Sequence, residues 1–175
     1  IEDPAARIRA PKGFKVELIY SVNKDAQGSW VNMTVDPKGR LIVSDQYGSL
    51  YRVDLADAGN DSVKVSKVEP IPAEIGEAQG LLWAFDALYV VVNGGGKYKS
   101  GLYKVTDSSG NDQLDKVELL REIEGGGEHG PHAVVLAPDG KSLYVVAGNS
   151  TAVPELSRSL VPKVWGEDYL LPRMV

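Results

Sequence analysis

One of the two histidines in the chain stands where similar tetrapeptides carry glutamine. Residues 25–28 read Asp-Ala-Gln-Gly, residues 77–80 read Glu-Ala-Gln-Gly, and residues 127–130 read Gly-Glu-His-Gly. Because imidazole exchanges a proton near neutral pH, His129 is a candidate general base. The alternative is a histidine that only hydrogen-bonds the backbone of a neighbouring part of the fold.

The glutamines at the matching positions extend this candidate site. If the three segments occupy equivalent places in the fold, Gln27, Gln79 and His129 converge on one opening. His132 follows three residues later in a segment expected to be extended, where the two rings point to opposite sides. Joint metal chelation by the two histidines is therefore disfavoured.

A second candidate site is the polar segment 107–118. Compared with the twelve-residue EF-hand loop, oxygen-bearing side chains occupy positions 1, 3, 5, 9 and 12. These residues are Asp107, Ser109, Asn111, Asp115 and Glu118. A ring of oxygens suits a hard cation, so the segment is a candidate calcium site. Position 6 carries Asp112 instead of glycine, and the alternative is a polar hairpin loop with Asx turns.

Short extended elements must position these residues. Glycines and prolines separate short segments rich in Val, Tyr, Leu and Ile, and we find no sustained 3.6-residue periodicity of helical length. We therefore expect an all-β chain. The expected strands are residues 14–20, 31–35, 40–45, 50–54, 63–71, 81–85, 88–93, 102–106, 117–123, 133–137 and 143–147.

An internal repeat organises these strands. The glycines that end the related tetrapeptides are 52 and then 50 residues apart, and the Leu-Tyr pair at 50–51 returns 52 residues later at 102–103. Four antiparallel strands in a unit of this length are typical of a β-propeller blade. We expect blades near 27–78, 79–128 and 129–175, the third incomplete. A propeller closes with about four to eight blades, so the chain is expected to be a partial propeller from a longer protein.

Several segments resemble a known family. They are residues 11–17, 28–30, 36–41, 128–132, 138–140, 146–149, 165–168 and 170–173. These segments resemble the soluble quinoprotein sugar dehydrogenase-like propellers. More closely, they resemble the propeller module of large secreted planctomycete-type proteins that also carry cytochrome c and haem-binding domains.

The resemblance implies a function. It implies oxidation of a sugar or alcohol by pyrroloquinoline quinone (PQQ), with His129 taking the hydroxyl proton and a cytochrome c domain accepting electrons. Gln27, Gln79, His132 and Asn149 are the candidate cofactor-binding residues, and a periplasmic or secreted bacterial location is expected. Where the family's dehydrogenases typically carry a Gly-Arg-like pair, this chain has Pro131-His132. The alternative function is therefore a non-enzymatic propeller that binds a glycan or a protein partner.

Composition excludes other classes of function. The formal net charge is -5 and the pI about 5.1, so there is no basic field to attract nucleic acid. The longest apolar runs are far shorter than the roughly 20 residues of a membrane span. Without cysteine there is no disulfide or thiolate zinc site. Trp30 and Trp83 are expected to pack between blades, with a sugar-stacking platform as the alternative.

Overall fold

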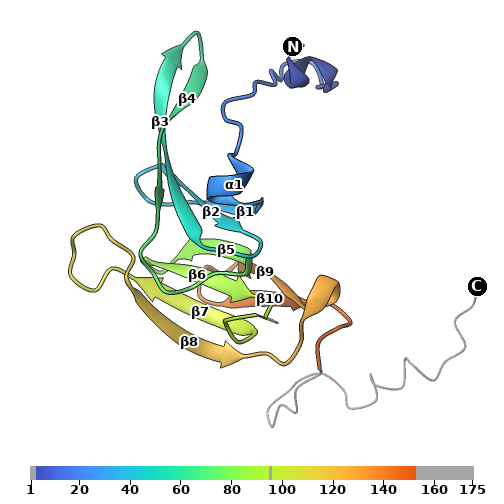
Figure 1. Ribbon diagram of the computed structural model, residues 1–175, viewed down its shortest axis with the longest axis vertical. Helices are drawn as coiled ribbons and strands as arrows, with labels where there is room; N and C mark the ends of the chain where they lie inside the picture. Colours follow the sequence, from blue (N-terminus) through green and yellow to red (C-terminus); the bar gives the residue numbers. More distant parts are fainter. Residues whose placement is uncertain (1–2, 95, 153–175) are drawn as a thin grey trace, which may run out of the picture.

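The computed structural model describes residues 3–94 and 96–152. Strands dominate it, with one short α-helix and two short 3₁₀ helices (Figure 1). In chain order the elements are η1 (Pro4–Arg7), α1 (Lys24–Gln27), β1 (Trp30–Val35), β2 (Leu41–Asp45), β3 (Leu50–Gly59), β4 (Ser62–Pro70), β5 (Ala78–Ala84), β6 (Ala87–Val92), β7 (Gly101–Thr106), β8 (Lys116–Glu122), η2 (Gly127–His129), β9 (Pro131–Leu136) and β10 (Leu143–Ala147).

The strands form separate antiparallel sheets. The first sheet has the order β1-β2-β3-β4, the second has the order β5-β6-β7-β8, and the third pairs β10 with β9. Each strand therefore pairs with its neighbour in the sequence. The prediction of an all-β chain built from sheets of four antiparallel strands is confirmed. The described residues close no barrel, and no propeller is evident in them.

The three sheets pack through their first strands, since β5 contacts both β1 and β9. The second sheet is consequently covered on both faces near β5 and β6, and every residue of β6 is buried, whereas β8 at its far edge is mostly exposed. On one face Val90 lies in an apolar cluster with Ile42 and Leu50 of the first sheet. On the other face Val91 lies in a cluster with Val134 of the third sheet. This central position makes the ends of β5 and β6 the place where all three sheets can contribute side chains.

Residues 14–20, which were expected to form a strand, are not one. They pair with no described strand, and their apolar side chains are exposed, including Phe14 at 74%. Side-chain contacts hold the segment instead, because the Ser62 hydroxyl donates to Glu17 Oε1 at 2.8 Å. The α1 helix that follows is capped at its N-terminus by Asn23, whose Oδ1 accepts from the backbone N–H of Asp25 at 3.1 Å.

A register shift marks the start of the first strand in each sheet. Single residues are left unpaired between consecutive partners on the neighbouring strand. The three unpaired residues are Val31, Gln79 and His132. A β-bulge turns the local backbone and re-aims the side chain that it carries. Gln79 and His132 are therefore structurally equivalent, although the tetrapeptide repeat matched Gln79 with His129.

Gly80, next to the bulge at Gln79, permits the close approach of β5 to β9. A Cβ atom at Gly80 would lie 2.4 Å from the His132 carbonyl oxygen and 3.0 Å from the Ala133 Cα, both backbone atoms. We expect Gly80→Ala to lower stability by about 1–3 kcal/mol, because the two strands must separate. At this chain length that corresponds to about 2–12 °C in Tm, measured by circular dichroism.

The matched control is Gly39→Ala, since Gly39 has φ +77° and open space around its Cβ position. It carries a conformational cost without a clash. Gly80→Ala should therefore shift the NMR signals of the His132 ring, and Gly39→Ala should leave them in place. Unchanged His132 signals in Gly80→Ala would contradict the close approach.

Candidate functional site

A cavity of about 660 Å³ lies at the shared end of the three sheets. Its size is within the usual range of small-molecule sites. Amide, carboxylate, hydroxyl and imidazole groups line it, contributed by the turn after β2, the start of β5, the end of β6, η2 and β9. The lining residues are Gln46, Tyr47, Glu77, Gln79, Asn93, Gly94, Gly96, Gly127, Glu128 and His132.

A contact with the backbone sets the tautomer of the neutral His132 ring. Its Nδ1 lies 2.7 Å from the carbonyl oxygen of Gly130, which can only accept a hydrogen bond. Nδ1 therefore carries the proton in the neutral ring, and Nε2 is left with a lone pair. The half-buried ring can accept a proton or a hydroxyl hydrogen bond at Nε2.

Glu77 lines the cavity and has a strained backbone conformation. Its φ is +55°, in the left-handed region that non-glycine residues seldom occupy. Its carboxylate accepts from the backbone of Lys97 at 2.9 Å, and its backbone N–H donates to the Gly48 carbonyl at 3.0 Å. The residue thus ties the first sheet to the turn after β6, and such strain is concentrated at functional sites.

The structure brings together only part of the histidine-centred site expected from the sequence. Gln79 and His132 line the cavity, whereas Gln27, His129 and Asn149 are not among its described lining residues. Gln27 Oε1 accepts a hydrogen bond from the Tyr20 hydroxyl at 2.6 Å, so this amide oxygen is engaged beside the α1 helix. His129 is exposed at the end of η2, and Asn149 is exposed after β10. Their assignment to a site stays a prediction.

The polar lining residues that sequence reasoning missed are Gln46, Tyr47, Glu77, Asn93 and Glu128. Glu77 and Glu128 belong to the repeated tetrapeptides, so the repeat contained a signal for them, but only the glutamines and His129 were singled out. Asn93 is the last residue of the expected strand 88–93 and precedes a glycine run, so nothing in its position singled it out. Its Nδ2 donates to the Gly127 carbonyl at 2.5 Å, which links β6 to η2 across the cavity.

The lining does not suit PQQ. This cofactor carries three carboxylates, and its site needs cationic donors. The described lining residues include the acidic Glu77 and Glu128 and contain neither lysine nor arginine. Asn93 Oδ1 is buried without a partner, which adds an acceptor and not a donor. An acidic, amide-rich cavity is better matched to an uncharged ligand that donates hydrogen bonds.

Residues 107–115 form the loop between β7 and β8, and residues 116–118 are the start of β8. The Asp107 carboxylate accepts from four backbone N–H groups, the shortest being that of Asp112 at 2.6 Å. Desolvation raises the pKa of Asp107, but these hydrogen bonds outweigh it and leave the pKa below its ordinary value. Asp115 accepts from the Ser108 hydroxyl at 2.9 Å, and Asn111 Oδ1 from the backbone of Gln113 at 3.0 Å.

These bonds direct most of the oxygens of the expected calcium loop toward the loop itself. In the described residues, no three acidic or histidine side chains are grouped so that they could hold a metal ion. Calcium binding by Asp107, Ser109, Asn111, Asp115 and Glu118 stays a prediction.

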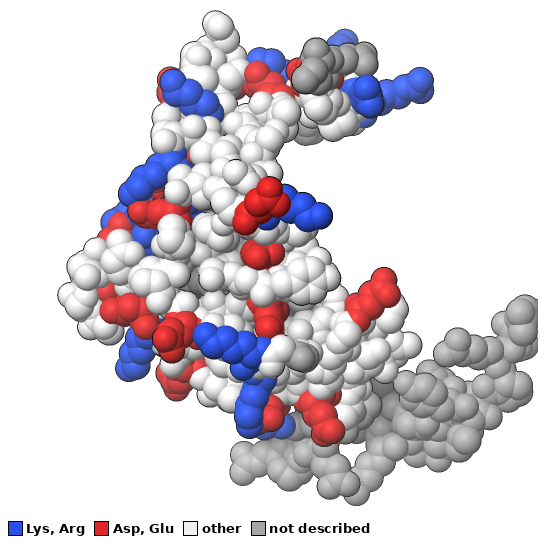
Figure 2. All heavy atoms as spheres, in the orientation of Figure 1, with Lys and Arg blue, Asp and Glu red and all other residues white. Residues whose placement is uncertain are grey.

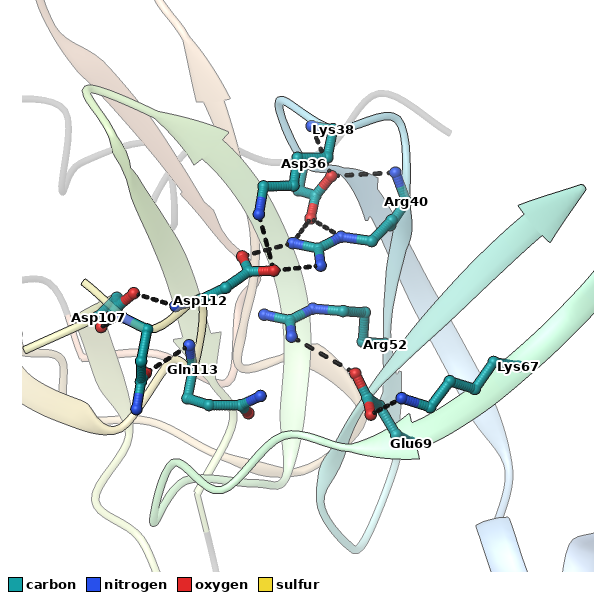
Figure 3. Close-up of polar contacts among 10 residues, drawn as sticks. Asp36, Lys38, Arg40, Arg52, Lys67, Glu69, Asp107, Asp112 and Gln113 are labelled. Atoms are coloured by element: carbon teal, nitrogen blue, oxygen red, sulfur yellow. Dashed lines mark hydrogen bonds and ion pairs between the residues drawn. The ribbon is translucent and has the colours of Figure 1, made fainter. Parts of the chain in front are cut away.

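A network of charges joins this loop to the first sheet (Figure 3). Arg40 donates to both oxygens of Asp112, at 2.6 and 2.8 Å, and to Asp36 Oδ2 through Nε at 2.7 Å. Lys38 lies 2.8 Å from Asp112. Hydrogen bonds from Arg40 and then Lys38 hold the pKa of Asp112 far below its ordinary value of 3.8. The Arg40 pKa is raised, chiefly by the hydrogen bond to Asp112.

Elsewhere on the surface, acidic and basic side chains are interspersed over the face drawn in Figure 2. No helix in the described part of the chain is long and apolar enough to cross a membrane. Neither known protein families nor curated proteins give a match to this chain.

One solved structure is similar to this fold. It is the iodide structure of a Trichoderma reesei carbohydrate-active enzyme of family AA12, with a TM-score of 0.62 and 18% sequence identity over 81% of this chain. The chain spans about a third of the length of that enzyme, 34%. At this identity the likeness shows the fold alone.

The resemblance read from the sequence was wrong as a family assignment. The matching structure belongs to family AA12, and the separate sheets of the described residues form no evident propeller. The short segments on which the resemblance depended are mostly turns and strand starts, which recur wherever antiparallel strands repeat. Those at 165–168 and 170–173 lie outside the described residues.

Proposed function

We propose that the cavity at the shared end of the three sheets binds a neutral sugar or polyol. The observation that carries the proposal is the convergence of Gln79 and His132, each from a matching bulge on a neighbouring sheet, into one cavity. Bulges next to binding sites serve to aim a side chain. The fold likeness to a carbohydrate-active enzyme is compatible with this ligand class.

The chemistry of the lining supports the same ligand. Hydroxyl groups both donate and accept, so they pair with amides such as Gln46 and Gln79 and with the carboxylate of Glu77. Tyr47 is 78% exposed at the rim, where its ring offers a flat apolar surface to the C–H face of a sugar. The two acidic residues disfavour an anionic ligand.

The test uses the two histidines as internal reporters. Glucose, galactose and xylitol are titrated into ¹⁵N-labelled protein while the imidazole signals are followed by NMR. We expect the His132 signals to move with saturation and the His129 signals to stay, because only His132 lines the cavity.

Two variants complete this experiment. Gln79→Leu should weaken binding about 2–10-fold, as expected for the loss of one or two neutral hydrogen bonds. His129→Gln, on an exposed position outside the described lining, should leave the affinity unchanged. Movement of His129 alone, or no response to any of the three ligands, would rule out this site.

A second candidate function is oxidation of the bound alcohol. The observation that favours it is the lone pair at His132 Nε2, fixed by the contact between Nδ1 and the Gly130 carbonyl. A base in this state can take the hydroxyl proton as the carbinol carbon loses hydride to an acceptor. The step needs a two-electron hydride acceptor of the quinone or flavin class, held by residues outside the described lining, and an added dye then takes the electrons from that acceptor.

A further inference from the structure

Arg52 on β3 is a buried cation with too few partners. Its side chain is 4% exposed, and its Nε has no hydrogen-bond partner in the described part of the chain. The nearest acidic atom is Glu69 Oε1 at 3.6 Å, beyond good hydrogen-bond distance. Glu69 also lies 2.5 Å from Lys67 Nζ, and Lys67 is the main cause of its lowered pKa.

Burying a guanidinium beside a single shared carboxylate carries a desolvation cost that the pair offsets only in part. Since Glu69 is shared with Lys67, the charge of Arg52 is only partly compensated by the protein. A buried guanidinium that is only partly paired is suited to receive a hydrogen-bond acceptor from a bound ligand.

The guanidinium borders a second cavity, separate from the sugar site. This cavity has a volume of about 360 Å³ and lies between the first sheet, the second sheet and the β7–β8 loop. Trp83, Thr106 and Leu114 contribute an aromatic ring, a hydroxyl and an apolar wall. Figure 3 shows the Arg52 guanidinium pointing into the space below the pair formed by Arg40 and Asp112.

The acidic residues of this cavity are mostly occupied. Asp36 and Asp112 are paired with Arg40, and Asp107 accepts from four backbone N–H groups. Asp86 is exposed on the turn between β5 and β6, where water screens its charge. The group in the wall that still lacks partners is therefore a donor, Arg52, and not an acceptor.

We propose that this second cavity binds the carboxylate of a small sugar acid, such as a uronate or an aldonate, through Arg52. Guanidinium and carboxylate match as a planar bidentate pair. The Trp83 ring offers a stacking surface to the sugar, and Thr106 offers a hydroxyl partner. The site is distinct from the cavity lined by Glu77 and Glu128, whose described lining has no lysine or arginine, and the proposal does not depend on the function of that cavity.

The test compares glucuronate with glucose at equal concentration and ionic strength. In protein labelled with ¹⁵N at arginine, glucuronate should shift the Arg52 Nε–H signal and raise the Tm, and glucose should not shift that signal. Acetate tests the carboxylate alone and should shift the same signal at higher concentration. The result that overturns the proposal is an Arg52 signal that does not respond to glucuronate.

Two substitutions separate binding from structure. Arg52→Met keeps the length of an apolar stem and removes the charge, so the Tm gain with glucuronate should vanish while the Tm without ligand stays level or rises. Arg52→Lys retains a charge but not the planar pair, and should keep part of the gain. If the full gain persists in Arg52→Met, or if that variant loses stability without ligand, Arg52 is structural and the proposal fails.

Discussion

Replacement of His132 with glutamine is expected to lower the rate of dye-linked alcohol oxidation by about 10²- to 10⁴-fold when a quinone or flavin hydride acceptor is supplied with the dye. His132 Nε2 is the lone pair that would take the hydroxyl proton, and glutamine offers a carbonyl oxygen that cannot hold it near neutral pH. The substitution introduces the side chain found at the equivalent bulge residue, Gln79, so the fold should persist. The measurement is dye reduction with a panel of aldoses and polyols.

His129→Gln is the matched control for this experiment. It makes the same chemical change at an exposed position outside the described cavity lining and should leave the rate near that of the wild type. Sugar binding by NMR is recorded for both variants, so that loss of binding is distinguished from loss of a base. If the wild type binds sugar but reduces no dye, the binding function stands and the proposal of alcohol oxidation is wrong.

The contrast between His129 and His132 shows where sequence reasoning reached its limit. The repeat was aligned on the glycine that ends each tetrapeptide, so Gln79-Gly80 was aligned with His129-Gly130. In the fold, Gln79 lies in a bulge on β5, whereas His129 lies in a 3₁₀ turn ahead of β9. Pro131 could have signalled the difference, because a proline at the first position of a strand places the next residue, His132, inside it.

Strand prediction succeeded where the strand has a partner within the repeat. The expected strands from residue 31 onward are present, because alternating apolar residues and glycine-rich turns encode local hairpins. The segment 14–20 has the same composition but no strand beside it in the described residues, so its backbone cannot form a ladder. Local sequence indicates whether a segment prefers the strand conformation. Whether another strand lies beside it to form hydrogen bonds depends on the whole fold.

The charged sites were harder to predict, for a related reason. Arg52 lies in the expected strand 50–54, and Asp36 and Lys38 lie between the expected strands 31–35 and 40–45, so none of the three stood out as a site residue. Their contacts join residues as distant as Arg40 and Asp112, which are 72 positions apart. No pattern within a single repeat encodes such a pair, because it depends on how two sheets pack.

Asp36→Ala is expected to destabilise the fold by about 3–5 kcal/mol, the usual cost of breaking a buried ion pair from one side. The Asp36 side chain is 2% exposed, and Oδ2 accepts from Arg40 Nε at 2.7 Å. Its other oxygen accepts from the backbone N–H groups of Lys38 at 2.9 Å and Arg40 at 3.0 Å. Alanine therefore removes a cation's partner and the acceptor that orders the turn between β1 and β2. Urea unfolding measures the loss.

Two further substitutions divide this loss into its causes. Asp36→Asn keeps an acceptor for the turn and removes the charge. It should therefore lower the free energy of unfolding by less than Asp36→Ala does. Asp112→Asn changes the other partner of Arg40. The Asp112 side chain is 41% exposed, so this substitution should lower stability by less than about 1 kcal/mol. Because Arg40 carries the contact between the first sheet and the β7–β8 loop, Asp36→Ala should also loosen the cavity beside Arg52. Equal losses for Asp36→Ala and Asp112→Asn would mean that burial of Asp36 is not what anchors this network.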